Sequence, residues 1–255
     1  MQVRAAGPGD YETWLDFVTY LSISGTPSSR ERYETGIMPN ALFVEADGQV
    51  VGYALSFAFG TRGDVRQIAV APTARKRGVG GILMAAVREK LVQRGCTDWR
   101  LEVLAENTPA IALYRASGMR ELWVTHELRI PPDVRKSIAR PVLDLEPVTP
   151  DDDDALETAF DLGRGQIQRW RSFRPNARLV TIEHRAFAQI IDDYADDHGL
   201  IFPLYATDND CLRSIIATTF DKTYEVVVTD DRMLVAAGAE RLRDALIFGG
   251  SLRDR

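Results

Sequence analysis

The stretch IAVAPTARKRGVGGIL, residues 68–83, decides how the fold of this chain is interpreted. It starts with apolar residues typical of a buried strand, passes through a turn that begins at Pro72, and continues into residues that favour a helix. The basic, glycine-rich loop between strand and helix consists of Arg75, Lys76, Arg77, Gly78, Val79, Gly80 and Gly81. The sequence therefore predicts a strand, a loop and a helix in direct succession.

This loop has the composition of an anion-binding site. The first N–H groups of a helix have no partner within the helix and carry partial positive charge, so phosphate binds there readily. Gly78 and Gly80 let a bulky anion approach the backbone, and the three cationic side chains attract it. The loop matches neither the P-loop nor the Gly-x-Gly-x-x-Gly dinucleotide pattern. We expect a phosphate or pyrophosphate ligand.

The composition is that of an ordinary globular protein. The 255 residues are 45% hydrophobic and 27% charged, with a net charge of −6. This charge argues against a nucleic-acid partner, and no run approaches the roughly 18 apolar residues of a membrane span. The 2 cysteines and 3 histidines have no metal-ligand spacing, so we expect no metal site. Since no apolar signal region follows Met1, we expect a cytoplasmic protein.

Hydrophobic periodicity predicts the elements around the loop. The elements expected before it are a strand at 3–5, a helix at 11–21 capped by Asp10, a second helix from Ser28 and Ser29 to Asn40, and strands at 41–45, 50–59 and 65–70. The elements expected after it are a helix to Arg94, a strand at 98–104, a helix at 109–116, and a strand or tight strand pair at 122–130.

A second motif follows the loop. Residues 101–119, LEVLAENTPAIALYRASGM, resemble the signature Leu-x-Val…Asn-x-x-Ala-x-x-Leu-Tyr-x-x-x-Gly-Phe, with Met119 in the usual Phe place. Arg75, Gly78 and Gly80 fit the form Arg/Gln-x-x-Gly-x-Gly/Ala. Both motifs and the order of elements over residues 1–130 resemble the GNAT (GCN5-related N-acetyltransferase) superfamily.

The resemblance implies acetyl-CoA, or another acyl-CoA, as co-substrate. In the family, the strand at 65–70 is splayed from the strand at 98–104, and the acyl-CoA arm lies in the gap. Ile68, Ala69 and Val70 would then offer backbone groups to the pantetheine, with a strand N–H, that of Val70, on the thioester carbonyl. The loop at 75–81 would bind the pyrophosphate. Asn107 would contact the pantetheine, although it also suits a helix cap.

The resemblance also implies two catalytic residues. Tyr114 matches the residue that protonates the departing CoA thiolate, and an unperturbed phenol pKa near 10 suits a thiolate of similar basicity. Packing is the other interpretation of a helix tyrosine. Glu102 stands where the ribosomal-protein alanine acetyltransferases place a catalytic glutamate, but a solvated strand residue explains it equally. Gln67 stands where some relatives carry a glutamate base, so that base is absent, and we expect His126 to be structural.

The second half is predicted to be a degenerate repeat of the first half. We expect a GNAT domain at 1–130, a linker at 131–141 and a second domain at 142–255. An offset of 120 residues sets Gly238 on Gly118 and Leu234 on Tyr114. The elements expected here are strands at 143–148, 177–183, 186–191, 200–206, 224–231 and 242–252, a helical stretch after the acidic run 151–154, and helices at 208–220 and 232–239.

The predicted fold class is α/β (α+β), with two GNAT-like domains, each a mixed, mostly antiparallel sheet flanked by helices. The second domain lacks a basic glycine loop, and its acidic segment 206–210 would repel pyrophosphate, so we expect it not to bind CoA. The acidic run at 151–154 is explained by the helix dipole, with a cation site as the alternative.

The expected activity is N-acyl transfer, with direct attack on acetyl-CoA by a primary amine of a small molecule or peptide, without a covalent enzyme intermediate. The alternative is a non-catalytic acyl-CoA-binding or regulatory module. We expect either a monomer with pseudo-dimeric halves or a homodimer, with the second domain helping to shape the acceptor site.

Overall fold

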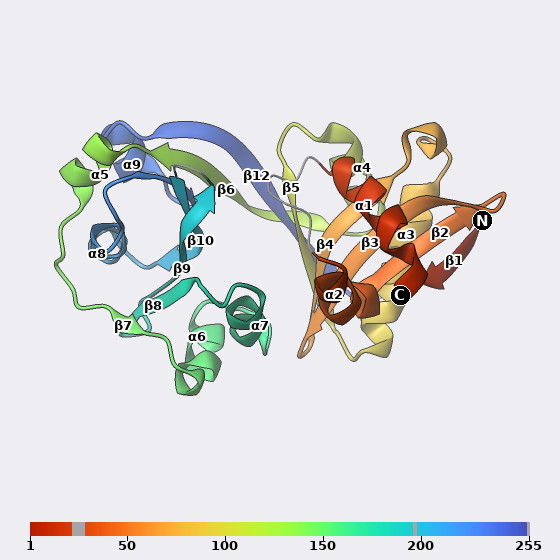
Figure 1. The fold of residues 1–255 in the computed structure, drawn as a ribbon, viewed down its shortest axis with the longest axis horizontal. Helices are drawn as coiled ribbons and strands as arrows, with labels where there is room; N and C mark the ends of the chain where they lie inside the picture. The colour runs from red at the N-terminus through yellow and green to blue at the C-terminus, as the bar shows by residue number, and fades with distance from the viewer. Residues whose placement is uncertain (22–28, 196–197, 254–255) are drawn as a thin grey trace. The chain divides into compact units, whose positions relative to one another are not determined.

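The computed structural model describes residues 1–21, 29–195 and 198–253. The chain divides into two compact units (Figure 1): unit 1 consists of Met1–Leu122 with Ile247–Arg255, and unit 2 of Trp123–Leu246. This division differs from the linear boundaries expected at 130 and 142. Residues 123–130 belong to unit 2, and the end of the chain belongs to unit 1.

Unit 1 contains a mixed, mostly antiparallel sheet, as predicted. Its strands are, in spatial order, β1 (Gln2–Ala5), β2 (Ala41–Ala46), β3 (Gln49–Phe59), β4 (Arg62–Val70), β5 (Asp98–Leu104) and residues 247–251 of β12 (Glu240–Ser251). Pairing is antiparallel from β1 to β4 and parallel between β4 and β5. Its main helices are α1 (Tyr11–Thr19), α3 (Val79–Gln93) and α4 (Thr108–Ala116).

The helix expected from Ser28 to Asn40 is replaced by short turns. Ser28 lies outside the described residues. Ser29 accepts a hydrogen bond from the Arg32 N–H at 3.3 Å, and the segments that follow are α2 (Arg30–Arg32), η2 (Tyr33–Ile37) and η3 (Met38–Asn40). Pro39 has no N–H and cannot continue a helical ladder, so the segment ends in a tight turn.

The two faces of the unit 1 sheet differ in the size of their side chains. One face is aromatic, and its buried core consists of Trp14, Phe17, Tyr33, Ile37, Ala41, Phe43, Tyr53, Leu55, Phe57, Phe59 and Ala69. The other face is shaped for α3: a Cβ at Gly52 would lie 2.6 Å from Val79 Cγ1, and one at Gly63 would lie 2.5 Å from Leu91 Cδ1. Glycine is therefore required at both positions for α3 to lie directly on β3 and β4.

The last part of the chain completes the core of unit 1. Phe248 is 0% exposed, and its ring centroid lies 6.2 Å from that of Tyr114. The Leu252 N–H donates to the Thr97 carbonyl at 2.8 Å, and the Leu252 carbonyl accepts from Arg88 at 2.9 Å. Residues more than 120 positions apart in sequence thus share one core.

Unit 2 repeats the strand pattern of unit 1. Its strands are, in spatial order, residues 240–246 of β12, β6 (Arg120–Ile130), β11 (Thr223–Val228), β10 (His198–Ala206), β9 (Ala186–Ala195), β8 (Arg178–Ile182) and β7 (Glu146–Pro147). Its helical segments are α5 (Pro132–Ile138), η5 (Pro150–Asp152), α6 (Asp153–Ala159), α7 (Gln166–Phe173), α8 (Asn209–Ala217) and α9 (Arg232–Ala236). The β10–β11 pair is parallel, and the β9–β10 pair is antiparallel.

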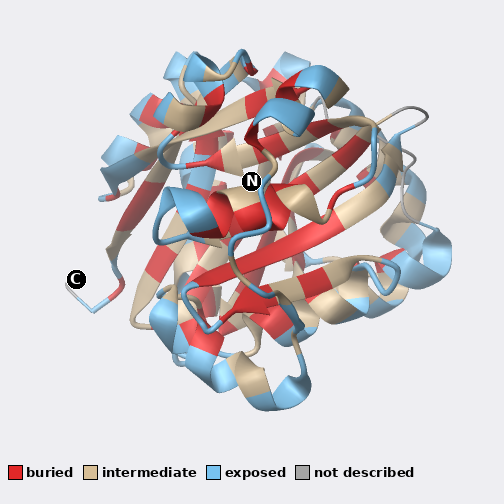
Figure 2. Cartoon of the chain, turned by 90° about the vertical axis from the view of Figure 1, so that its left-hand side faces the viewer, coloured by how far each residue is buried: buried red, intermediate tan, exposed pale blue. Residues whose placement is uncertain are grey.

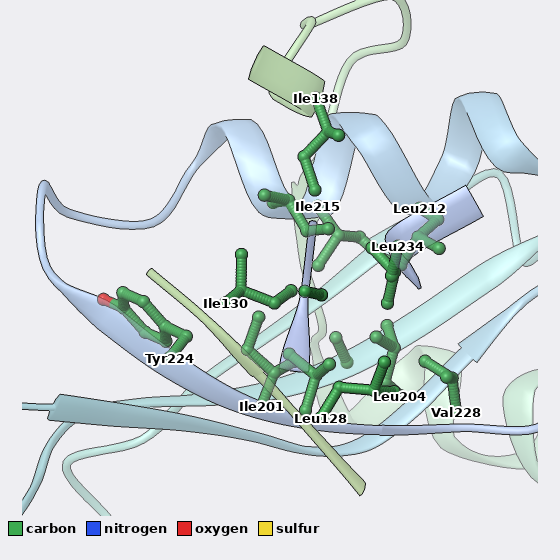
Figure 3. Packing of buried hydrophobic residues seen from close by; sticks show 14 of the residues in the cluster. Leu128, Ile130, Ile138, Ile201, Leu204, Leu212, Ile215, Tyr224, Val228 and Leu234 are labelled. Atoms are coloured by element: carbon green, nitrogen blue, oxygen red, sulfur yellow. The ribbon is translucent and has the colours of Figure 1, made fainter. Parts of the chain in front are cut away.

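The expected linker at 131–141 is more ordered than predicted. It contains α5, whose Val134 and Ile138 are buried in the main core of unit 2. Figure 3 shows Ile138 with Leu212, Ile215 and Leu234. The strand expected at 143–148 shrinks to the two-residue β7. Figure 2 shows buried residues along the strands and exposed residues on the helices and loops.

Among the described residues, no helix is both long and apolar enough to cross a membrane.

Phe248→Ala should destabilise the protein by about 3–5 kcal/mol, because it removes a fully buried ring and leaves a cavity. Urea unfolding followed by circular dichroism measures this change. The matched control is Phe220→Ala, because Phe220 is 60% exposed and its loss should cost under about 1 kcal/mol. Equal effects of the two substitutions would contradict the place given to Phe248 in the core.

Candidate active site

The basic loop and the start of α3 form an open helix N-terminus. Gly78 has φ +82°, a left-handed conformation that favours glycine, and α3 begins at the next residue. Among the described residues, no side chain caps α3 at this end. Arg75, Lys76 and Arg77 are all exposed. The first N–H groups of the helix and three cations thus lie in one short segment, as the sequence predicted.

Two glycines fix this loop in place. Gly52 pairs with Val70 and lies against Val79, so the start of α3 lies beside the end of β4. A Cβ at Gly80 would lie 3.0 Å from Leu113 Cδ2, so the first turn of α3 packs closely on α4. The loop is therefore held against both the β4 strand and the helix that carries Tyr114.

Strands β4 and β5 separate where the splay was expected. Their parallel pairing runs from Arg62 with Asp98 to Val65 with Leu101 and ends there. A shift in the β3–β4 register leaves Arg66 as an extra residue directly after this point. Because a β-bulge bends and twists its strand, it accounts for the separation.

Beyond the bulge, the backbone N–H and C=O groups of β4 point alternately toward β3 and toward the side of β5. The Ala71 N–H donates to the Val51 carbonyl of β3 at 3.0 Å. Backbone N–H and C=O groups point to opposite sides at successive residues of a strand. Those of Ala69 therefore also point toward β3, whereas those of Ile68 and Val70 point toward the side of β5. Arg75 Nε lies 3.4 Å from the Val70 carbonyl, which fits this orientation. The Val70 N–H is therefore directed to where the strands part.

Tyr114 is buried in α4 with an accessible hydroxyl. The residue is 8% exposed, and burial raises its pKa to about 12. No partner for the hydroxyl is found among the described residues, and this oxygen is not one of their fully buried unpaired atoms. The ring is therefore held by packing, and the hydroxyl stays protonated at neutral pH.

The other two predicted site residues are exposed. Glu102 is the first β5 residue after the pairing with β4 ends, and it lies between the buried Leu101 and Val103. Asn107 is the N-cap of α4, where its side chain accepts a hydrogen bond from the Ala110 N–H at 3.2 Å. The capping interpretation of Asn107 is confirmed. Among the described residues, no group of three or more His, Cys, Asp or Glu side chains could hold a metal ion.

A hydrogen-bond chain near β4 is a feature that the sequence analysis missed. Trp14 Nε1 donates to the Tyr53 hydroxyl at 3.1 Å, and that hydroxyl donates to Gln67 Oε1 at 2.9 Å. The nearly continuous apolar run of β3 indicates that Tyr53 is buried. It does not show which residues from other elements meet its hydroxyl.

The equivalent helix start in unit 2 is closed. Asp208 caps α8, accepting from the Cys211 N–H at 2.9 Å and from Arg185 at 2.6 Å. These bonds, the one from Cys211 first, lower the Asp208 pKa to about 2, so the carboxylate stays charged at the helix end.

The acid position of unit 2 is filled by an apolar side chain. The Ala239 N–H donates to the Leu234 carbonyl at 2.9 Å, as the Met119 N–H does to that of Tyr114 at 3.1 Å. This shared helix ending supports the 120-residue offset. Leu234 is 0% exposed. Its side chain lies among the apolar side chains shown in Figure 3. His126, which the sequence analysis expected to be structural, lies on β6, and its Nδ1 is 2.7 Å from Asp244 Oδ1.

Known proteins resemble this chain in part of its sequence and in its fold. Residues 12–119 match the model of the Acetyltransferase (GNAT) family. Two solved structures extend the likeness in fold to the whole chain. A tandem GNAT protein from the clavulanic acid biosynthesis pathway has a TM-score of 0.62 at 14% identity, covering 100% of this chain and 99% of its own. The GCN5-related N-acetyltransferase from Sphaerobacter thermophilus has a TM-score of 0.61 at 17% identity, with coverage of 99% and 96%. The fold is that of a tandem GNAT protein.

Relatives that match by sequence align over shorter segments. The mycothiol acetyltransferase of Clavibacter sepedonicus is 36% identical over 85 residues, which are 33% of this chain and 28% of that protein. An acetyltransferase of Pectobacterium atrosepticum is 33% identical over 73 residues, 29% of this chain and 52% of that protein. The chain thus spans between about a quarter and a half of the length of these two relatives.

Tyr114→Phe should reduce the loss of stability at high pH. Because the folded pKa of about 12 exceeds the ordinary value near 10, Tyr114 contributes stability that is complete below pH 10 and is lost as pH rises through 12. Urea unfolding between pH 9 and 11 should show a shallower decline for the variant than for the wild type. Tyr20→Phe, at a residue 41% exposed, is the control. Identical slopes for Tyr114→Phe and wild type would contradict the burial of the Tyr114 side chain.

Proposed function

We propose that the protein is an acyl-CoA-dependent N-acyltransferase that transfers acetyl from acetyl-CoA to a primary amine, with its site in unit 1. The observation that carries the proposal is the combination of an uncapped, basic helix start with two strands that part directly beside it. GNAT acetyltransferases use acetyl-CoA, and the family match covers the elements that contain this site.

The co-substrate would bind along three parts of unit 1. The pyrophosphate would lie on the N–H groups of Val79, Gly80 and Gly81, with Arg75, Lys76 and Arg77 as counter-charges. The pantetheine would run along Ile68, Ala69 and Val70, beside Asn107. Contrary to the expectation for all three residues, only Ile68 and Val70 would offer it backbone groups, because those of Ala69 point toward β3. The thioester carbonyl would accept a hydrogen bond from the Val70 N–H, and such a donor contributes roughly 3–4 kcal/mol where negative charge develops on the oxygen.

Transfer would occur in one direct displacement. The lone pair of the neutral amine attacks the thioester carbon, the C–N bond forms, and the C–S bond breaks. The leaving thiolate takes the Tyr114 proton, and the proton of the new ammonium goes to a base, for which Glu102 is the candidate. An amine with pKa near 10.4 must first lose its proton, which costs about 4.6 kcal/mol at pH 7.

Unit 2 would have another role than binding acyl-CoA. The helix N-terminus that would receive the pyrophosphate is occupied by the Asp208 carboxylate, and the acid position is Leu234. We propose that unit 2 is a degenerate copy of unit 1 that does not bind acyl-CoA. The match to a mycothiol acetyltransferase makes small-molecule amines a class to screen beside peptides.

Gly78→Glu should abolish acetyl-CoA binding, because it adds a negative side chain where the pyrophosphate would lie. Isothermal titration should give one site per chain for the wild type and an affinity at least 100-fold lower for the variant. Gly48→Glu is the matched control, since Gly48 has φ +76° in the β2–β3 turn and similarly open surroundings. If Gly78→Glu retains its affinity for acetyl-CoA, the loop does not bind the pyrophosphate.

Tyr114→Phe should lower kcat about 100-fold while the acetyl-CoA affinity stays within about twofold, because only the acid is lost. Thiol release with a panel of amines measures kcat, and titration calorimetry measures binding. Unchanged turnover in the variant would exclude the acid role. Binding of acetyl-CoA without turnover of any amine by the wild type would favour a non-catalytic acyl-CoA-binding module.

A further inference from the structure

We propose that Gln67 selects the acyl acceptor, donating a hydrogen bond from its side-chain amide to a carbonyl oxygen that neighbours the reacting amine. This inference rests on the proposed acyl transfer in unit 1. It names the acceptor as an α-amino amide or a peptide N-terminus, in preference to a plain alkylamine.

The hydrogen-bond chain fixes the orientation of the Gln67 amide. An indole N–H can only donate, so the Tyr53 hydroxyl accepts from Trp14 at 3.1 Å. The hydroxyl then has one proton to give, and Tyr53 is 0% exposed, so burying that proton unpaired would be costly. The Gln67 atom at 2.9 Å is therefore the carbonyl oxygen Oε1.

This orientation leaves the amide nitrogen for a ligand. Because Oε1 and Nε2 share one planar carbon, holding the oxygen against Tyr53 turns the nitrogen away from that hydroxyl. Gln67 is half-buried, and no partner for Nε2 is found among the described residues. Two N–H donors are thus presented from a side chain whose rotation the buried Tyr53 restricts.

The register places Gln67 and Glu102 on the same side of the sheet. Gln67 pairs with Leu55, which belongs to the aromatic core, so Gln67 lies on the aromatic face. Val65 pairs with Ser56 and with Leu101, which puts Leu101 on the α3 face. Glu102 follows Leu101 and therefore lies on the aromatic face, because side chains alternate along a strand.

The spacing along β4 suits a small amine. Gln67 precedes Val70 by three residues, about 10 Å along the strand, and a glutamine side chain spans part of that distance. An amine that attacks a thioester held at the Val70 N–H would then have its neighbouring atoms near Gln67. A donor there suits a carbonyl oxygen and does not suit a second ammonium group.

Glycinamide and isobutylamine are paired probes, since they have the same heavy-atom connectivity and differ in that the carboxamide of glycinamide is replaced by an isopropyl group. In nitrogen-15-labelled full-length protein loaded with CoA, glycinamide should shift the Gln67 side-chain amide signals, which the Gln67→Met spectrum identifies. Isobutylamine should not shift them. Equal shifts with both amines, or none with glycinamide, would overturn the inference.

Kinetics separate selection from a purely structural role. The ratio of kcat/KM for glycinamide over isobutylamine should fall about 3- to 10-fold in Gln67→Met and also in Gln67→Glu, because both lose the donor. Gln67→Glu keeps an oxygen for Tyr53, so an unchanged ratio in this variant, with a fall only in Gln67→Met, would mean that Gln67 merely pairs with Tyr53. Gln93→Met, on the exposed end of α3, is the control and should leave the ratio unchanged.

The failure of this inference can be told apart from failure of the proposed function. If the wild-type protein does not bind acetyl-CoA, the proposed function itself is contradicted. Intact CoA binding with no response of the Gln67 amide to glycinamide would remove only the role of Gln67.

Discussion

The uncapped start of α3 is the constraint on which the site depends. A helix N-terminus without a side-chain cap needs its N–H groups satisfied by water or by a ligand, and here it is packed against two neighbouring elements. Gly52 brings Val79 onto the sheet beside the end of β4, and Gly80 brings α4 against the first turn. The positions of the proposed anion site and of Tyr114 relative to the end of β4 therefore follow from the packing of one helix end.

Unit 2 has a similar arrangement of strands and helix but lacks the uncapped helix start. Its parallel β10–β11 pairing also ends after four residues, at Ile201 with Val226, and a helix follows β10. There the Asp208 carboxylate replaces the left-handed glycine and the cations, and satisfies the helix end internally. A difference in charge and capping at one helix start, with Leu234 in place of Tyr114, accounts for the different roles proposed for the two halves.

The sequence predicted the features that depend on local patterns. Strand 65–70, the loop at 75–81 and the capped helix after Asn107 all follow from residues close together in the chain, and the 120-residue offset follows from comparing two such local segments. That the end of the chain belongs to unit 1 could not be predicted, because Phe248 packs near Tyr114 through contacts that no local pattern encodes. The helix within the expected linker was missed because its prolines suggested a break, although Pro132 suits a first turn. The Trp14–Tyr53–Gln67 chain was missed because it joins three distant segments.

The most direct test of this account is a crystal structure of the protein with acetyl-CoA. The account requires one molecule per chain, its pyrophosphate on the N–H groups of residues 79–81 and its thioester carbonyl within hydrogen-bond distance of the Val70 N–H. Acetyl-CoA bound at the start of α8 would contradict it, as would a thioester remote from both β4 and Tyr114.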